Sequence, residues 1–157
     1  MVEKVVIRQL VRDTGRYSDK AVQVSGWIRT NRDQKTFGFI SLNDGSHFTS
    51  VQIVYEKASL ANFDEVARFR VGAAITICGT VVQTPNAKQP FEIKASEIIL
   101  EGDAPEDYPI QPKRHSREFL REVAHLRPRT NLFAAVDRKS TRLNSSHEVP
   151  SRMPSSA

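Results

Sequence analysis

Aromatic, amide and basic side chains gather in neighbouring stretches of the sequence, and together they suit contact with a nucleic-acid base. Phe39 lies in the alternating run 37–43, and Gln52 lies in the next alternating run. A phenylalanine ring can stack on any base, an interaction worth roughly 1 to 3 kcal/mol. A glutamine amide has both a donor and an acceptor, so it can hydrogen-bond the edge of one base. Three cations in the stretch 29–35 add positive charge of the kind that pairs with phosphate.

Alternation of apolar and polar residues predicts which way these candidates face. Four apolar residues share one face at period two, and they are Ile40, Leu42, Val51 and Ile53. If that face is the core, Phe37, Phe39 and Gln52 lie on the outer face. Packing under another segment would explain Phe37 equally well, and the stretch 29–35 taken alone would be a solvated turn. A ring, an amide and a basic loop that converge on one face favour RNA.

Five β-rich runs and one helical run are expected to position these residues. The strands are predicted at 21–31, 37–43, 48–55, 74–83 and 91–100, with hairpin-turn residue types at 43–46. Ser59 is the expected N-cap of a helix over 60–69. Three strands, a helix and two strands are the order of an OB-fold, a five-stranded Greek-key barrel. We therefore predict an all-β barrel with a short helix, which binds an oligonucleotide through its second and third strands and the loops 29–35 and 84–90.

Composition limits the classes of protein to which the chain can belong. It has 157 residues, a net charge of +5 and one cysteine, Cys78. A lone cysteine builds neither a disulfide framework nor a Cys-rich zinc site, and a core of this size needs neither. No apolar run approaches the roughly 18 to 20 residues of a membrane span. A cytoplasmic protein with no metal ligands and no membrane partner is therefore expected.

The segment 137–157 differs from the rest in being rich in serine and free of aromatic residues. Such a composition buries too little apolar surface to become ordered. The segment could be a solvated linker, a basic arm for nucleic acid, or non-native sequence. Its letters DRKSTRLNSSH resemble translated adaptor sequence, and the apolar run 133–136 before it stops mid-element. We therefore predict a non-native, disordered tail.

Several motifs resemble a known family. The letters GWIRTNRD (26–33), FGFISLNDG (37–45) and VQIV (51–54) resemble the anticodon-binding domain of the class II aminoacyl-tRNA synthetases for asparagine, aspartate and lysine. The stretch 108–131 is similar to the hinge and catalytic-domain entry of the asparaginyl enzymes in particular. The resemblance implies an anticodon-binding domain over 1–103, followed by a helical hinge and a truncated catalytic-domain start over 104–136. A short helix over 116–124, capped by Ser116, is expected there.

The resemblance implies roles for residues of the outer face. Phe39 would stack on the central uridine of the anticodon, and Gln52 would hydrogen-bond it. Arg32 would reach the same base or its phosphate.

The resemblance also implies roles in the second predicted loop. Asn86, Lys88 and Glu92 lie in the region where the family recognises the first anticodon base. A solvated carboxylate at the start of a strand would explain Glu92 equally well.

The catalytic groups of the family are expected to be missing from this chain. In the family, ATP and Mg²⁺ bind in a separate C-terminal domain, and residues 1–136 contain none of its motifs and no GxxxxGK[ST], HExxH or GxSxG. We therefore expect a fragment with no cofactor and no activity of its own, which binds the anticodon stem-loop of a tRNA as a monomer. The parent, a homodimer, would attach asparagine to tRNA with ATP and Mg²⁺.

Two other functions are compatible with an OB-fold. One is a freestanding domain that binds single-stranded nucleic acid, and the other is a module for protein contacts. The stretch 108–131 favours the synthetase fragment, because a freestanding domain has no use for a hinge.

Overall fold

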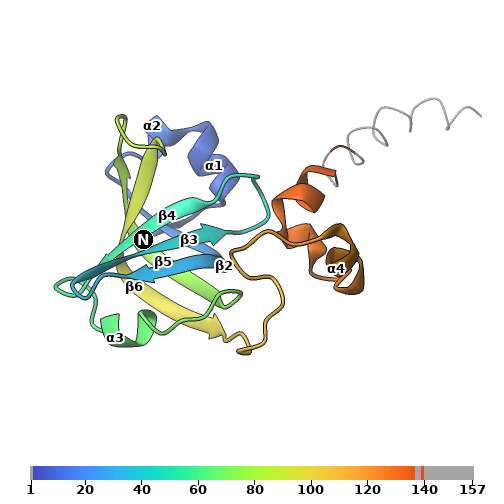
Figure 1. The fold of residues 1–157 in the computed structure, drawn as a ribbon. Coiled ribbons are helices and arrows are strands. Elements are labelled where there is room, and N and C mark those ends of the chain that lie inside the picture. Colours follow the sequence, from blue (N-terminus) through green and yellow to red (C-terminus); the bar gives the residue numbers. More distant parts are fainter. Residues whose placement is uncertain (1, 137–138, 140–157) are drawn as a thin grey trace, which may run out of the picture. The chain divides into compact units, whose positions relative to one another are not determined.

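The structure, a computed structural model, describes residues 2–136 and 139. The chain forms two compact units, Met1–Lys113 and Arg114–Ala157. The first unit contains all the strands of Figure 1, and the second contains the helix α4 (Arg117–Glu122). The predicted division into functional domains at 103 and 136 stays a prediction.

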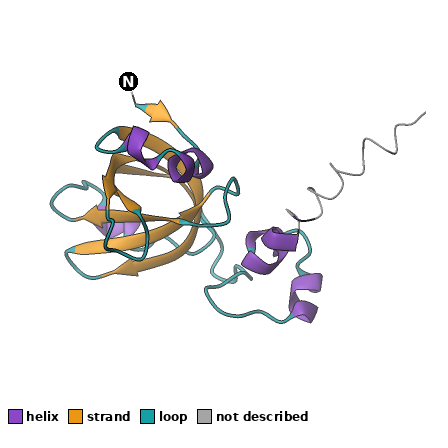
Figure 2. Ribbon diagram, turned by 90° about the horizontal axis from the view of Figure 1, so that it is seen from above, coloured by secondary structure: helices purple, strands orange, loops and turns teal. Residues whose placement is uncertain are grey.

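Five long strands build the first unit. They are β2 (Ala21–Asp33), β3 (Phe37–Asn43), β4 (Val51–Glu56), β5 (Ala74–Gln83) and β6 (Phe91–Gly102). The sheet order is β1-β2-β3-β4-β6-β5, in which β1 (Glu3–Lys4) is a short edge strand. Because β2 also pairs with β5, the sheet closes on itself, and Figure 2 shows the resulting ring of strands. The predicted OB-fold barrel is confirmed.

The alternating residues line the barrel as predicted. Ile40, Leu42 and Ile53 are fully buried, and Val51 is nearly so. Strand β2 pairs with β5 through residues 21–27 and with β3 through residues 27–33, so it changes partner at one point. A Cβ added at the adjacent Gly26 would lie 2.6 Å from the Asn43 carbonyl oxygen, so only glycine allows the two strands to come this close there.

Two short helices precede the barrel and were not predicted. They are α1 (Ile7–Arg12) and α2 (Thr14–Tyr17). Ile7 and Leu10 of α1 are fully buried, and the backbone N–H of Ile7 donates to Asp44 Oδ2 at 2.9 Å. After α2, the Lys20 carbonyl accepts a hydrogen bond from the N–H of Val81, near the end of β5. These hydrogen bonds attach α1 to the loop that follows β3, and the segment after α2 to the end of β5 (Figure 1).

Two predicted elements begin at the wrong residue, and the strands β2 and β6 end later than predicted. The helix between β4 and β5 is α3 (Phe63–Val66), with Asn62 at its N-cap, instead of 60–69 capped by Ser59. The N–H of Ser59 donates to the Glu56 carbonyl, so this residue belongs to the turn that ends β4. The third strand begins at Val51 instead of at 48, because residues 44–50 form a loop. At its tip Gly45 has a φ of 78°, the positive φ expected of a turn.

The second unit contains short helical turns. Ser116 caps α4 as predicted, and its Oγ accepts the N–H of Phe119 at 3.2 Å. A 3-10 turn follows at Arg127–Arg129, and residues 131–136 are helical. Apart from Lys139, the tail predicted at 137–157 lies outside the described residues. Within the described part of the chain, every helix is too short or too polar to cross a bilayer.

Candidate nucleic-acid interface

Strand pairing places the candidate residues in two rows across the outer face of the barrel. Arg32, Phe39, Val54 and Lys94 are successive Cα partners on β2, β3, β4 and β6, and we call them the Phe39 row. Neighbouring strands lie roughly 4.8 Å apart, so the side chains of one row adjoin each other. In the Phe39 row the aromatic ring therefore lies between two cations. Arg32 is on the strand next to Phe39, and Lys94 is on the second strand in the other direction.

A second row lies beside the first on the same face. Thr30, Ser41 and Gln52 are successive Cα partners on β2, β3 and β4. Glu92 on β6 joins them through the Gln52 side chain, whose Nε2 donates to Glu92 Oε2 at 3.4 Å. We call these four residues the Gln52 row. The two rows together form the contact face.

The Phe39 ring is held by a second aromatic ring. The centroids of Phe37 and Phe39 are 5.4 Å apart, and the ring planes are perpendicular, at 85°. Both side chains are half-buried, so each keeps part of its ring at the surface. The outer-face prediction for Phe37 and Phe39 is confirmed, and the edge-to-face contact restrains the orientation of Phe39.

Gln89 attaches the β5–β6 loop to β4 next to Gln52. Its Oε1 accepts the backbone N–H of Gln52 at 3.1 Å, and its Nε2 donates to the Ser50 carbonyl at 3.3 Å. The Gln89 amide thus supplies the hydrogen bonds that a neighbouring strand would make to β4, at residues where β4 no longer pairs with β6. A single glutamine in an irregular loop gives no sequence signal for this role.

The structure brings four of the six predicted site residues together. Arg32, Phe39, Gln52 and Glu92 lie in the two rows of the contact face. Asn86 and Lys88 are exposed in the β5–β6 loop, away from the strand pairing that defines the rows. The role of each of the six in binding stays a prediction.

Lys94 is a candidate that the sequence analysis missed. Phe91, Ile93 and Ala95 are buried, so Glu92 and Lys94 must face outward. The period-two pattern of β6 contained this information, because Lys94 follows Glu92 by two residues.

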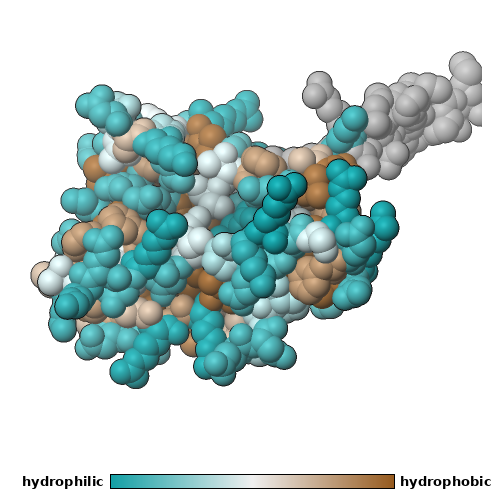
Figure 3. All heavy atoms as spheres, viewed as in Figure 1, coloured by the Kyte–Doolittle hydropathy of each residue, from teal (hydrophilic) through white to brown (hydrophobic). Residues whose placement is uncertain are grey.

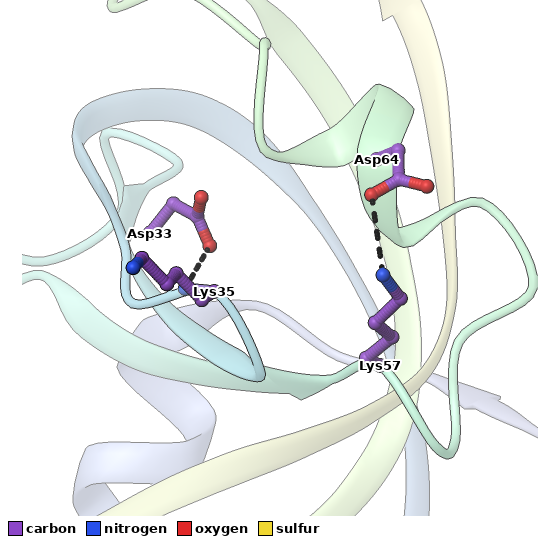
Figure 4. A network of polar contacts seen from close by, with 4 residues as sticks. All are labelled: Asp33, Lys35, Lys57 and Asp64. Atoms are coloured by element: carbon purple, nitrogen blue, oxygen red, sulfur yellow. Dashed lines mark hydrogen bonds and ion pairs between the residues drawn. The ribbon is translucent and has the colours of Figure 1, made fainter.

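The prediction of a basic loop at 29–35 is wrong in its bounds. Strand β2 continues to Asp33, so Arg32 lies on a strand opposite Phe39. The turn comes at 34–36, where Lys35 has a φ of 67° and its N–H donates to Asp33 Oδ1 at 3.0 Å (Figure 4). The length of β2 exceeds the predicted one because β3 pairs with it along residues 27–33.

The charged side chains near this face differ in how far they are exposed to solvent. Figure 4 also shows the ion pair between Lys57 and Asp64, whose atoms are 3.9 Å apart. Both side chains are largely exposed, so the pair contributes little to stability. Arg29, by contrast, is half-buried, and burial lowers the pKa of its guanidinium. No group of three or more His, Cys, Asp or Glu side chains that could hold a metal ion occurs among the described residues.

Asn31 connects the barrel wall behind the contact face to α3. Its Nδ2 donates to the carbonyls of Val66 at 2.9 Å and Phe69 at 3.1 Å, and its Oδ1 accepts the Tyr55 hydroxyl at 2.8 Å. Tyr55 is fully buried, and its ring lies against Gly38, the residue between Phe37 and Phe39. These contacts join β2 and β3, which carry Arg32 and Phe39, to the buried Tyr55 of β4.

We expect Tyr55 to make the fold sensitive to alkali. Burial, and then the charge of Asp33, raise the pKa of its hydroxyl from 10.0 to about 12. Below pH 10 the hydroxyl is neutral in both states, and from there to about 12 it ionises only in the unfolded chain. The free energy of unfolding should therefore fall over this interval. Urea unfolding at about pH 9 and pH 11.5 should show a smaller fall for Tyr55→Phe than for the wild type. An equal fall in both proteins would contradict this assignment.

Comparison with known proteins adds to this geometry. The family model described as "OB-fold nucleic acid binding domain" matches residues 22–101, which include all of β3, β4 and β5 and all but one end residue of β2 and of β6. The chain belongs to this family. An asparagine–tRNA ligase of Acholeplasma laidlawii is 61% identical over 134 residues, which are 85% of this chain and 29% of the relative. One of Clostridium perfringens is 51% identical over 138 residues, 88% of this chain and 30% of the relative.

Solved structures agree with the fold of this OB-fold domain. This chain matches the structure of asparaginyl-tRNA synthetase from Pyrococcus horikoshii complexed with asparaginyl-adenylate, with a TM-score of 0.77 at 23% identity. The match covers 94% of this chain and 34% of the synthetase chain. An asparaginyl-tRNA synthetase of Entamoeba histolytica matches with a TM-score of 0.64 and covers 83% of this chain and 30% of that one. The chain thus spans about 30% of the length of its curated relatives.

Proposed function

We propose that this OB-fold domain binds the anticodon stem-loop of a tRNA through its contact face, as the RNA-binding part of an asparagine–tRNA ligase. The main support is the placement of Phe39, Gln52, Arg32 and Lys94 on one outer face. Homology over 85% of the chain to an asparagine–tRNA ligase supports the choice of RNA. The attachment of asparagine to tRNA, with ATP and Mg²⁺, is assigned to the longer parent, which we infer to be a cytoplasmic homodimer.

The contact face divides recognition between stacking and hydrogen bonding. Phe39 offers a ring to any base, whereas Arg32 and Lys94 offer charge to phosphates, and none of these groups distinguishes one base from another. Gln52 can distinguish bases. Its Nε2 already donates to Glu92, and no described residue donates a hydrogen bond to its Oε1. A carbonyl oxygen placed at N3 accepts the N3–H of uridine, whereas cytidine has an acceptor at N3, so Gln52 in this position would favour a uridine.

The surface of the domain favours RNA over a protein partner. Figure 3 shows mostly hydrophilic residues on the visible face, with hydrophobic residues in small separate patches. The large apolar side chains that are exposed among the described residues come from separate elements, such as Val6 near α1, Phe48 in the loop 44–50 and Ile99 in β6. Protein interfaces usually have a contiguous apolar core at their centre.

We expect Gln52→Ala to remove the preference for a central uridine while binding persists. The wild type should bind an anticodon hairpin with a central uridine more tightly than one with a central cytidine, by roughly 2- to 10-fold for one net hydrogen bond. In Gln52→Ala this ratio should approach one. Fluorescence titration of the two labelled hairpins with the full chain measures both affinities.

Gln23→Ala is the matched control for this experiment. Gln23 lies on the part of β2 that pairs with β5, opposite Cys78 and away from the two rows. Its removal should leave the ratio of the two affinities unchanged. Equal binding of both hairpins by the wild type would contradict anticodon recognition, and a generic binder of single strands would then explain the face better.

A further inference from the structure

Three exposed arginines lie on the helices that precede the barrel. Arg8 and Arg12 are one turn apart on α1, and Arg16 follows on α2. Among the described residues none of the three forms an ion pair. We call them the arginine ridge. Side chains four positions apart on a helix share a face, so Arg8 and Arg12 present their charges together.

The loop 44–50 connects the arginine ridge to the contact face. The Arg8 backbone N–H donates to Ser46 Oγ at 3.0 Å, and its Nε donates to the Ser46 carbonyl at 3.0 Å. Ser46 belongs to the loop that runs directly into β4, of which Gln52 is the second residue. At the base of this loop Asn43 Nδ2 donates to Ser50 Oγ at 3.3 Å. Hydrogen bonds thus hold α1 against the loop that leads into the Gln52 end of the contact face.

The chemistry of the arginine ridge suits phosphate groups. A guanidinium donates parallel hydrogen bonds to phosphate oxygens, and it stays charged at any physiological pH. Arg8 uses its Nε for the loop, but its exposed side chain keeps other N–H groups for a ligand. The three exposed arginines therefore place positive charge on the two helices that Arg8 joins to the loop 44–50.

We propose that the arginine ridge binds backbone phosphates of the RNA stem that flanks the loop held by the contact face. This inference rests on the proposed function, because a bound hairpin must continue from its loop into a paired stem. Each strand of that stem has one phosphate charge per nucleotide, and such contacts add affinity without base specificity. The hydrogen bonds from Arg8 to Ser46 attach the ridge to the loop that leads into β4, and the stem is the part of the hairpin that extends beyond the contact face.

The double variant Arg12→Gln/Arg16→Gln tests this inference in the full chain. Two labelled RNAs are titrated, an anticodon hairpin and a linear oligonucleotide with only the loop sequence. The variant should bind the hairpin roughly 5-fold more weakly at low salt, as expected for two exposed charge pairs. Its salt dependence for the hairpin should fall by about two counterions. Binding of the linear oligonucleotide should stay within about twofold of the wild type.

Lys57→Gln/Arg68→Gln is the matched control, because it removes the same charge from exposed residues beside α3. This control should bind both RNAs as the wild type does. Unchanged hairpin binding by the ridge variant, or an equal loss for both RNAs, would overturn the inference while leaving the proposed function intact. Failure of the wild type to bind either RNA would overturn both. Thermal melting of each variant checks that the barrel is folded.

Discussion

Replacing Phe39 with alanine is expected to weaken binding of every anticodon hairpin by roughly 5- to 150-fold, the loss of one stacked base. The ring is half-buried, and Phe37 fixes its orientation, so it is ready to stack before RNA arrives. Because every base has a π-face, the ratio between uridine and cytidine hairpins should change little. Fluorescence titration with the same two hairpins measures both effects.

Phe39→Leu separates stacking from apolar cover. Leucine keeps an apolar side chain beside Val54, the residue of β4 that pairs with position 39. It has no π-face on which a base could stack. If stacking is the role of Phe39, the leucine variant should bind nearly as weakly as the alanine variant. Wild-type affinity in the leucine variant would show that Phe39 only covers the sheet, which is the role of many half-buried aromatic residues.

Much of the barrel could be predicted because strands leave a local signal. The period-two pattern of Ile40, Leu42, Val51 and Ile53 depends only on which side of a strand faces the core, and all four are buried. The same alternation correctly placed Phe39 on the outer face. The same alternation along β6 predicts that Lys94 faces outward, as Glu92 does.

Other features depend on contacts between distant residues, and local sequence does not specify these. The extension of β2 to Asp33 follows from pairing with β3, and this moves Arg32 from a predicted loop into the Phe39 row. The Gln89 amide meets β4 only after the barrel has closed. Likewise, α1 is stabilised by burial of Ile7 and Leu10 and by Asp44, which is remote in sequence. Short helices generally depend on such packing more than on propensity.

Gly38→Ala is expected to destabilise the fold more than any surface substitution in the contact face. A Cβ at this position would lie 2.7 Å from Tyr55 Cε1 and would overlap the neighbouring ring atoms and the hydroxyl oxygen. Tyr55 is fully buried, so its ring has little room to move away. Overpacking typically costs about 1 to 3 kcal/mol of stability. A displaced Tyr55 hydroxyl would also lose its hydrogen bond to Asn31 Oδ1. Urea unfolding followed by circular dichroism measures the loss in free energy.

Gly15→Ala and a double-mutant cycle separate this overlap from the general effects of losing a glycine. Nothing lies within 4 Å of a Cβ added at Gly15 in α2, so alanine there should be neutral or stabilising by up to about 1 kcal/mol. In a Tyr55→Leu background the overlap is removed, and Gly38→Ala should cost clearly less than in the wild type. This coupling is expected because the two residues are in direct contact. The same cost in both backgrounds would mean that the Tyr55 ring does not explain the need for glycine between Phe37 and Phe39.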